Sequence, residues 1–308
     1  MGTTGNPGAS VSSLKAARCH QHMSGTWMDW LTAPLQYEFM RLALLAGGLV
    51  GVLCPVMGAF LVVQRMSLMG NVVAHSVLPG LVLAHVLRWP LLVGAFGFGL
   101  ASTTVVAWVR SHSRIKADAI MALILASFFA LGVVFITLFN AQLNLEALLF
   151  GDILSVTRSD LWQVGIIAAL TVVLVVLFYK ELLFFTFDRA GAQAMGLPVQ
   201  VIDGGLTVAT TLAIVASLKT VGVILVVAMM VGPAIAAYLW VKELHSLLVL
   251  SALLGAGGSG VGIYLSYYLD LPSGAAIALV MFVLFWLSLI ISPSQGLLGY
   301  WWRRLGAE

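Results

Sequence analysis

Long apolar stretches dominate the chain and alternate with short polar segments. A membrane-spanning α-helix needs about 20 consecutive, mostly apolar residues. Nine stretches approach this length: 40–63, 66–87, 91–109, 119–139, 161–179, 200–218, 220–240, 246–268 and 273–292. Eight spans is the alternative if 66–87 or the 200–240 region folds irregularly. The pattern predicts an all-α polytopic membrane protein with about eight or nine transmembrane helices.

Composition supports this fold class and excludes several others. Apolar residues make up 61% of the 308 positions and charged residues only 9%, against about 25% charged residues in soluble domains. The sequence contains no G-x-x-x-x-G-K-[ST], no H-E-x-x-H and no G-x-S-x-G, so it carries none of these phosphate-binding or hydrolytic motifs. The net charge of +3 fits basic residues clustered at cytoplasmic loops. We expect the lipid bilayer, and no nucleic acid, as its surroundings.

Three segments follow from the distribution of polar residues. Residues 1–33 are polar and rich in Gly, Ser and Thr, which predicts a disordered or dispensable extension, with Met28 as an alternative start to Met1. Residues 34–296 form the predicted transmembrane domain. Residues 297–308 form the predicted cytoplasmic tail.

Lysine and arginine near the span ends predict the orientation. If residue 65 faces the cytoplasm, nine basic residues lie inside: Arg65, Arg110, Arg114, Lys116, Lys180, Arg189, Lys242, Arg303 and Arg304. Six then lie outside: Lys15, Arg18, Arg41, Arg88, Arg158 and Lys219. This bias predicts an N-terminus outside the cell and a C-terminus in the cytoplasm. The same arrangement places the acidic residues Glu146, Asp152, Asp160 and Asp270 on the outer face.

The second stretch contains the strongest candidate for chemistry inside the membrane. His75 lies ten residues beyond Arg65, which is about 15 Å into a hydrocarbon core of about 30 Å. Asn71, four residues earlier, shares its helix face, and Pro79 removes the hydrogen bond to the His75 carbonyl. These groups suit a borderline divalent cation. The alternative is an interhelical hydrogen bond from His75 at a kinked helix. His85 is a second possible contact.

A second predicted helix break lies at Pro233, which would free the carbonyl of Met229. Transporters commonly place binding sites at such broken helices. The Met229 sulfur could add a soft contact, although methionines in the middle of a span are usually core residues. Asp and Glu are missing from the middle of the nine predicted spans, which argues against transport driven by a proton or sodium gradient.

The polar loop at 187–198 predicts a short helix outside the membrane. Its alanines and glutamine favour a helix, and Gly196 with Pro198 would end it. A short helix in this position suits docking to a soluble partner.

Four segments together resemble one known family. Residues 61–80, LVVQRMSLMGNVVAHSVLPG, resemble the signature of the bacterial ABC-type permeases for zinc and manganese. The similarity continues through 187–198, 221–237 and 265–274, and it covers about 35–296.

The resemblance implies an ABC importer permease fold in the bacterial plasma (inner) membrane. It also implies a second permease copy, a cytoplasmic ABC ATPase dimer and an extracytoplasmic metal-binding protein as partners. The chain would then be no enzyme: it would use ATP only through its partner and would hold no stably bound cofactor.

The family's residues map onto this chain with some departures. The family histidine corresponds to His75, and its common aspartate is replaced by Asn71. In the ATPase-coupling loop Phe187, Asp188, Ala192, Ala194 and Gly196 match, whereas Arg189 and Ala190 depart.

The resemblance and the ligand types predict import of a divalent metal ion. Manganese is narrowly preferred over zinc because oxygen ligands suit a harder ion. One alternative is a permease for iron–siderophore or cobalamin cargo. An alternative of another class is a metal channel or an intramembrane enzyme.

Overall fold

The computed structural model describes residues 34–140, 151, 153 and 156–292. The predicted extension 1–33 with Met28, the tail 297–308, and the acidic residues Glu146 and Asp152 lie outside these residues. The chain divides into two compact units, Met1–Arg41 and Leu42–Glu308. In the first unit a short 3₁₀ helix, Pro34–Gln36, precedes the first α-helix of the described residues, and the Arg41 side chain donates to the Leu35 carbonyl.

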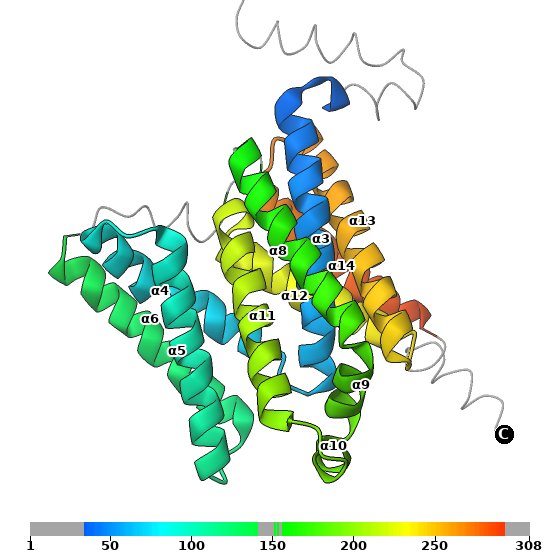
Figure 1. The fold of residues 1–308 in the computed structure, drawn as a ribbon. Coiled ribbons are helices and arrows are strands. Elements are labelled where there is room, and N and C mark those ends of the chain that lie inside the picture. The colour runs from blue at the N-terminus through cyan, green and yellow to red at the C-terminus, as the bar shows by residue number, and fades with distance from the viewer. Residues whose placement is uncertain (1–33, 141–150, 152, 154–155, 293–308) are drawn as a thin grey trace, which may run out of the picture. The chain divides into compact units, whose positions relative to one another are not determined.

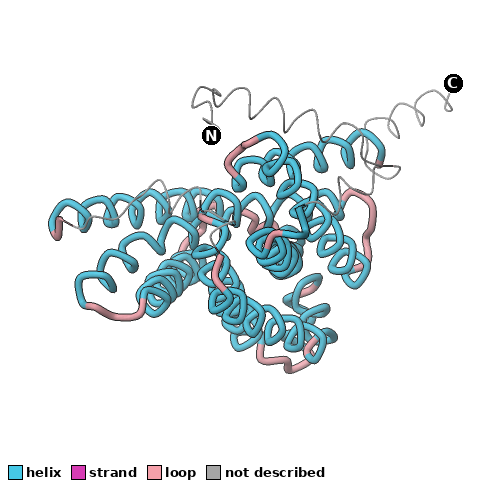
Figure 2. Tube along the Cα trace, turned by 90° about the horizontal axis from the view of Figure 1, so that it is seen from above, coloured by secondary structure: helices cyan, strands magenta, loops and turns pink. Residues whose placement is uncertain are grey.

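The described residues form helices joined by short loops, with no strand among them (Figure 2). The α-helices are α3 (Glu38–Val63), α4 (Leu68–Leu87), α5 (Leu91–His112), α6 (Ala117–Leu138), α8 (Arg158–Leu177), α9 (Tyr179–Phe187), α10 (Arg189–Ala194), α11 (Val199–Val221), α12 (Val223–Tyr238), α13 (Leu244–Leu269) and α14 (Ser273–Ile291). The all-α prediction is therefore confirmed.

Eight of the described helices are long and apolar enough to cross a membrane: α3, α4, α5, α6, α8, α11, α13 and α14. The ninth predicted span, 220–240, is the shorter helix α12 of 16 residues. A single residue, Gly222, separates α12 from α11. Its backbone angles, φ 81° and ψ 163°, lie in a region that only glycine occupies readily. The 200–240 region is thus the irregular one.

Helix α4 packs between α5 and α6, with which it forms a group of three helices (Figure 1). Gly80 of α4 and Gly94 of α5 bring the two backbones together. A Cβ atom added to Gly94 would lie 2.6 Å from the Ala84 Cβ atom. On the other side of α4, a Cβ atom added to Gly132 of α6 would lie 2.7 Å from Leu78. Small residues thus allow α4 to be enclosed on two sides.

Glycines also bring together the remaining helices of the second unit. Helices α12, α13 and α14 pack on one another, and α11 packs against α5 and α8. A Cβ atom added to Gly51 of α3 would lie 2.7 Å from the Gly255 carbonyl oxygen of α13. One added to Gly262 of α13 would lie 2.6 Å from the Ile277 Cα atom of α14. The glycine-rich composition therefore corresponds to close helix contacts.

Candidate functional site

The predicted metal ligands His75 and Asn71 lie on one face of α4. Both side chains are half-buried, whereas the surrounding residues Val72, Val73, Ala74 and Ser76 are buried. The His75 ring meets the ring of Phe129 on α6 edge-on, with ring centroids 5.6 Å apart and planes at 86°. An aromatic pair in this geometry is attractive. The structure therefore gives His75 an aromatic neighbour and leaves part of its face, with Asn71, open in the single chain.

The two prolines do not end their helices. Pro79 lies inside α4 and Pro233 inside α12, and the helix continues through both. Each proline still lacks a backbone N–H, so one carbonyl in the preceding turn loses its helical donor. The break in the chain lies instead at Gly222, between α11 and α12. The helix breaks predicted at Pro79 and Pro233 are therefore not interruptions of the helix, whereas Gly222 is.

Met229, the predicted soft contact, is completely buried in α12. Its neighbour Met230 packs against two other helices. The Met230 backbone carbonyl approaches Gly58 of α3 so closely that an added Cβ atom would overlap it. A Cβ atom added to Gly70 of α4 would lie 2.7 Å from the Met230 sulfur. Helix α12 therefore packs against α4 at Gly70. Packing, rather than an open contact with cargo, explains both methionines in this conformation.

His85 lies apart from His75. It is exposed in the last turn of α4, where Arg88 ends the helix in a left-handed conformation with φ 56°. No group of three or more His, Cys, Asp or Glu side chains converges among the residues that the structure describes. A metal ion at His75 would therefore need further ligands that are not His, Cys, Asp or Glu side chains of the described residues in the same chain.

The predicted short helix in the loop 187–198 is present as α10. Asp188 caps it by accepting a hydrogen bond from the Gly191 backbone N–H at 2.8 Å, the usual role of aspartate at a helix start. Gly196 follows the helix with φ +80°, as expected at a glycine C-cap. Of the predicted coupling residues, Ala192 is fully buried, whereas Phe187 is 57% exposed.

Arg189, which departs from the family pattern, fixes α10 to its neighbours. Its guanidinium donates to the Asp203 carboxylate of α11 at 2.7 Å and lies over the Phe185 ring of α9, 5.3 Å from the centroid. Asp203, Arg110 and Met66 line the same cavity of about 220 Å³, so the loop after α3, the end of α5 and α10 share one end of the bundle. We refer to it as the Met66 end.

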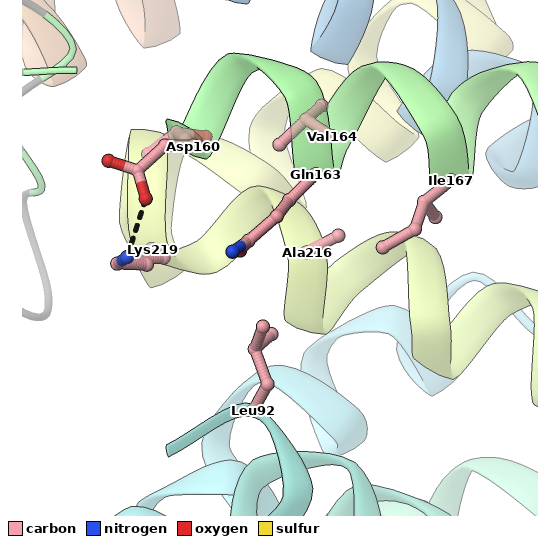
Figure 3. A pocket seen from close by; sticks show the side chains of 8 residues that line it. Leu92, Asp160, Gln163, Val164, Ile167, Ala216 and Lys219 are labelled. Atoms are coloured by element: carbon pink, nitrogen blue, oxygen red, sulfur yellow. Dashed lines mark hydrogen bonds and ion pairs between the residues drawn. The ribbon is translucent and has the colours of Figure 1, made fainter. Parts of the chain in front are cut away.

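At the opposite end, which we refer to as the Lys219 end, an ion pair joins α8 and α11. The Lys219 Nζ atom lies 2.5 Å from the Asp160 Oδ1 atom. Figure 3 shows the two side chains meeting at the rim of a small pocket that also includes Leu92 and Gln163. Asp160 additionally forms a capping box with Thr157. The sequence placed both charges on one side of the membrane but gave no signal that they are paired.

Comparison with known proteins identifies the family. The ABC 3 transport family matches residues 36–292. The chain belongs to this family. It is therefore a multi-pass inner-membrane permease subunit of an ABC transporter and not an enzyme, because ATP hydrolysis in such transporters belongs to a separate subunit. The predicted family and fold are confirmed, and the alternative of an intramembrane enzyme or a channel is wrong.

Curated relatives match over nearly their whole length. The chain is 40% identical to the manganese transport system membrane protein MntC of Listeria monocytogenes, over 88% of this chain and 97% of the relative. It is 35% identical to a probable iron transport system membrane protein of Haemophilus influenzae, over 88% and 96% of the two chains. Among solved structures it is similar to PsaBC from Streptococcus pneumoniae in complex with Fab, with a TM-score of 0.79 and 33% identity over 88% of this chain and 98% of that one.

Proposed function

We propose that this member of the ABC 3 transport family is the permease of an importer for divalent metal ions, with manganese preferred over zinc. One observation carries the proposal: the polar side chains of Asn71 and His75 share the half-open face of α4, a helix whose other residues around them are buried. An ionisable side chain within a membrane span is costly and marks a pathway by default. The manganese transport system membrane protein MntC is 40% identical over 88% of this chain.

A second copy of the chain would complete the site. A polar face cannot stay against lipid tails without cost, so protein or water has to cover it. Two copies related by a two-fold axis present the same surface to each other. Facing α4 helices would then contribute two imidazole nitrogens and two amide oxygens to a passing ion. This geometry supports a homodimer and explains why one chain alone lacks a complete ligand set.

The distribution of basic residues supports the orientation. Between residues 42 and 292 the Met66 end carries seven of them, in the loops after α3 and α12, around the end of α5, and in α9 and α10: Arg65, Arg110, Arg114, Lys116, Lys180, Arg189 and Lys242. The Lys219 end carries Arg88, Arg158 and Lys219. By the positive-inside rule the Met66 end with α10 faces the cytoplasm. There α10 would dock an ABC ATPase dimer, and the Lys219 end would receive metal from an extracytoplasmic binding protein. In the proposed orientation the N-terminus lies outside the cell and the C-terminus in the cytoplasm.

Nitrogen and oxygen ligands underlie the metal preference. Manganese favours carboxylate, carbonyl and water oxygens, whereas thiolates favour zinc. Asn71 supplies an amide oxygen, and the one cysteine among the described residues, Cys54, is buried and donates to the Ser217 hydroxyl at 3.5 Å. The site therefore offers no free thiolate beside His75. The uncharged side chains of Asn71 and His75 would bind the ion weakly, which suits an ion that has to dissociate into the cytoplasm.

The test is ATP-dependent uptake of ⁵⁴Mn²⁺ by proteoliposomes that contain the chain, its ATPase subunit and its metal-binding protein. We expect His75→Ala to lower the initial uptake rate about tenfold or more, as the loss of roughly 1.4 kcal/mol would. His85→Ala, the matched control on the same helix, should leave the rate unchanged. Unchanged uptake by His75→Ala would contradict the proposed pathway.

A permease for iron–siderophore or cobalamin cargo is the competing possibility. The relative described as a probable iron transport system membrane protein is named for iron, and its name does not say whether that iron is free or chelated. Uptake of labelled siderophore complex that exceeds uptake of the free ion would favour it.

Competition by zinc tests the preference for manganese over zinc. At equal concentration, Zn²⁺ should inhibit ⁵⁴Mn²⁺ uptake less than unlabelled Mn²⁺ does.

A further inference from the structure

An apolar cavity lies between α8, α9 and α11, away from His75. Its volume is about 340 Å³, within the range of about 300–1,000 Å³ that is usual for ligand sites. Leu174 and Val175 of α8, Leu182 of α9 and Ala209 of α11 contribute to its wall. Figure 1 shows these three helices side by side, with α9 continuing from the end of α8. The cavity therefore lies beside α8, α9 and α11, with Met57 of α3 also in its wall, and not at the face of α4 that carries His75.

The wall of this cavity contains one ionisable residue, Glu181 of α9, among the described residues that line it. The Glu181 side chain is half-buried, and no ion pair or side-chain hydrogen bond involves it in the part of the chain that the structure describes. A carboxylate in an apolar wall at the membrane boundary is costly unless a positive charge meets it. The occupant should therefore be apolar over most of its length and cationic at one end.

The cavity opens on the surface of the single chain. Val201 of α11 is 70% exposed and Phe178, which precedes α9, is 49% exposed, and both line the cavity. Lipid tails are the solvent that surrounds such a face. Lys180, next to Glu181 in the sequence, is exposed as well. A cationic and an anionic side chain are therefore adjacent just beyond the end of the membrane-spanning helix α8, at the level where we expect lipid head groups.

We propose that this cavity binds one phospholipid whose head group carries a primary ammonium. One acyl chain fills the space between α8 and α11, the ammonium pairs with the Glu181 carboxylate, and the phosphate lies toward Lys180. The primary ammonium donates charge-assisted hydrogen bonds that a trimethylammonium group lacks. Because α9 leads into α10 and Arg189 lies over Phe185 of α9, the lipid supports the base of the proposed ATPase-docking helix.

The test measures lipid retained by the detergent-purified chain after exchange into micelles with equal amounts of phosphatidylethanolamine and phosphatidylcholine. Mass spectrometry then counts each lipid per chain. We expect a preference of about tenfold for phosphatidylethanolamine. Glu181→Gln should bring the two lipids to equal retention. Glu243→Gln, an exposed acid outside the cavity, should keep the preference. Equal retention by the unmodified chain would overturn the proposal.

Two glycines of α11 provide a matched pair for blocking the cavity. Neither Gly204 nor Gly205 has an atom within 4 Å of an added Cβ, but only Gly205 lines the cavity. Gly205→Phe should abolish retention of both lipids, and Gly204→Phe should retain them like the unmodified chain. Ala209→Leu provides a second blocking change in case Gly205→Phe does not fold. Retention of phosphatidylethanolamine by both blocked variants would contradict the site.

A photo-reactive group at Val201 separates a lipid from a protein occupant. In proteoliposomes we expect Val201→p-benzoylphenylalanine to cross-link to phosphatidylethanolamine. A cross-link to a second copy of the chain would assign the cavity to a subunit interface and overturn the proposal. These binding measurements need no transport, so they stay valid if the proposed metal specificity is wrong.

Discussion

His75 of α4 meets the edge of the Phe129 ring of α6, with ring centroids 5.6 Å apart and planes almost perpendicular at 86°. The contact orients the imidazole from the side of α6. The part of the His75 face that remains open also carries Asn71. The proposed ligand pair is therefore positioned by a neighbouring helix and not by α4 alone.

We expect Phe129→Ala to lower ATP-dependent Mn²⁺ uptake about two- to tenfold, because an edge-on aromatic pair contributes about 0.5–1.5 kcal/mol. Uptake by Phe129→Ala, His75→Ala and the double variant completes a double-mutant cycle. If Phe129 acts by orienting His75, its loss should have little further effect once His75 is absent. Additive effects of the two changes would mean that Phe129 acts elsewhere.

The contact of α4 with α5 predicts an asymmetry between two glycines of α5. Gly94→Ala forces a methyl group against α4, whereas Gly97 has open space around an added Cβ. We expect Gly94→Ala to destabilise the protein by about 1–3 kcal/mol. Gly97→Ala should be neutral or stabilise it by up to about 1 kcal/mol, because alanine is the better helix former. Thermal unfolding in detergent measures both, and equal transition temperatures for the two variants would contradict the packing.

The turn at Gly222 should tolerate no side chain. With φ 81° and ψ 163°, this residue occupies backbone angles that cost other residues about 1–3 kcal/mol. We expect Gly222→Ala to destabilise the protein by this amount, and Gly204→Ala, in the regular part of α11, to leave stability almost unchanged. Unfolding followed by circular dichroism in detergent compares them. A stable Gly222→Ala variant would show that α11 and α12 can join in another way.

Removing the side chain that caps α10 should weaken the docking of the ATPase subunit. Asp188→Ala removes the acceptor for the Gly191 N–H, at a cost of about 0.5–2 kcal/mol to the helix start. We expect weaker binding of the ATPase subunit, by about two- to tenfold, because the docking helix is no longer preformed. Asp188→Asn keeps a capping oxygen and serves as the control. Affinity of the detergent-purified chain for the ATPase subunit is the measurement, and equal affinities of the two variants would rule out a role for the cap.

Local sequence features were sufficient for much of the fold. Each long apolar stretch became one helix, since a chain in a bilayer has to satisfy its backbone hydrogen bonds within the helix. The short helix α10 could likewise be predicted from Asp188, the alanines and Gly196, because helix capping depends on residues that are neighbours in sequence. The 220–240 stretch forms a helix of 16 residues, so the alternative of eight spans with an irregular 200–240 region is confirmed. Hydropathy alone does not choose between the two counts, because it does not register one glycine with a positive φ.

The sequence by itself determined the membrane class, the helical spans and the placement of Asn71 and His75 on one helix face, because these depend on hydropathy and on the period of the helix. Only the tertiary structure decided that Phe129 meets His75, that Met230 packs against Gly70, and that Asp160 pairs with Lys219. Such contacts join residues far apart in the chain. Which residues meet depends on how glycines let the helices approach, and this is a property of three-dimensional packing and not of local pattern.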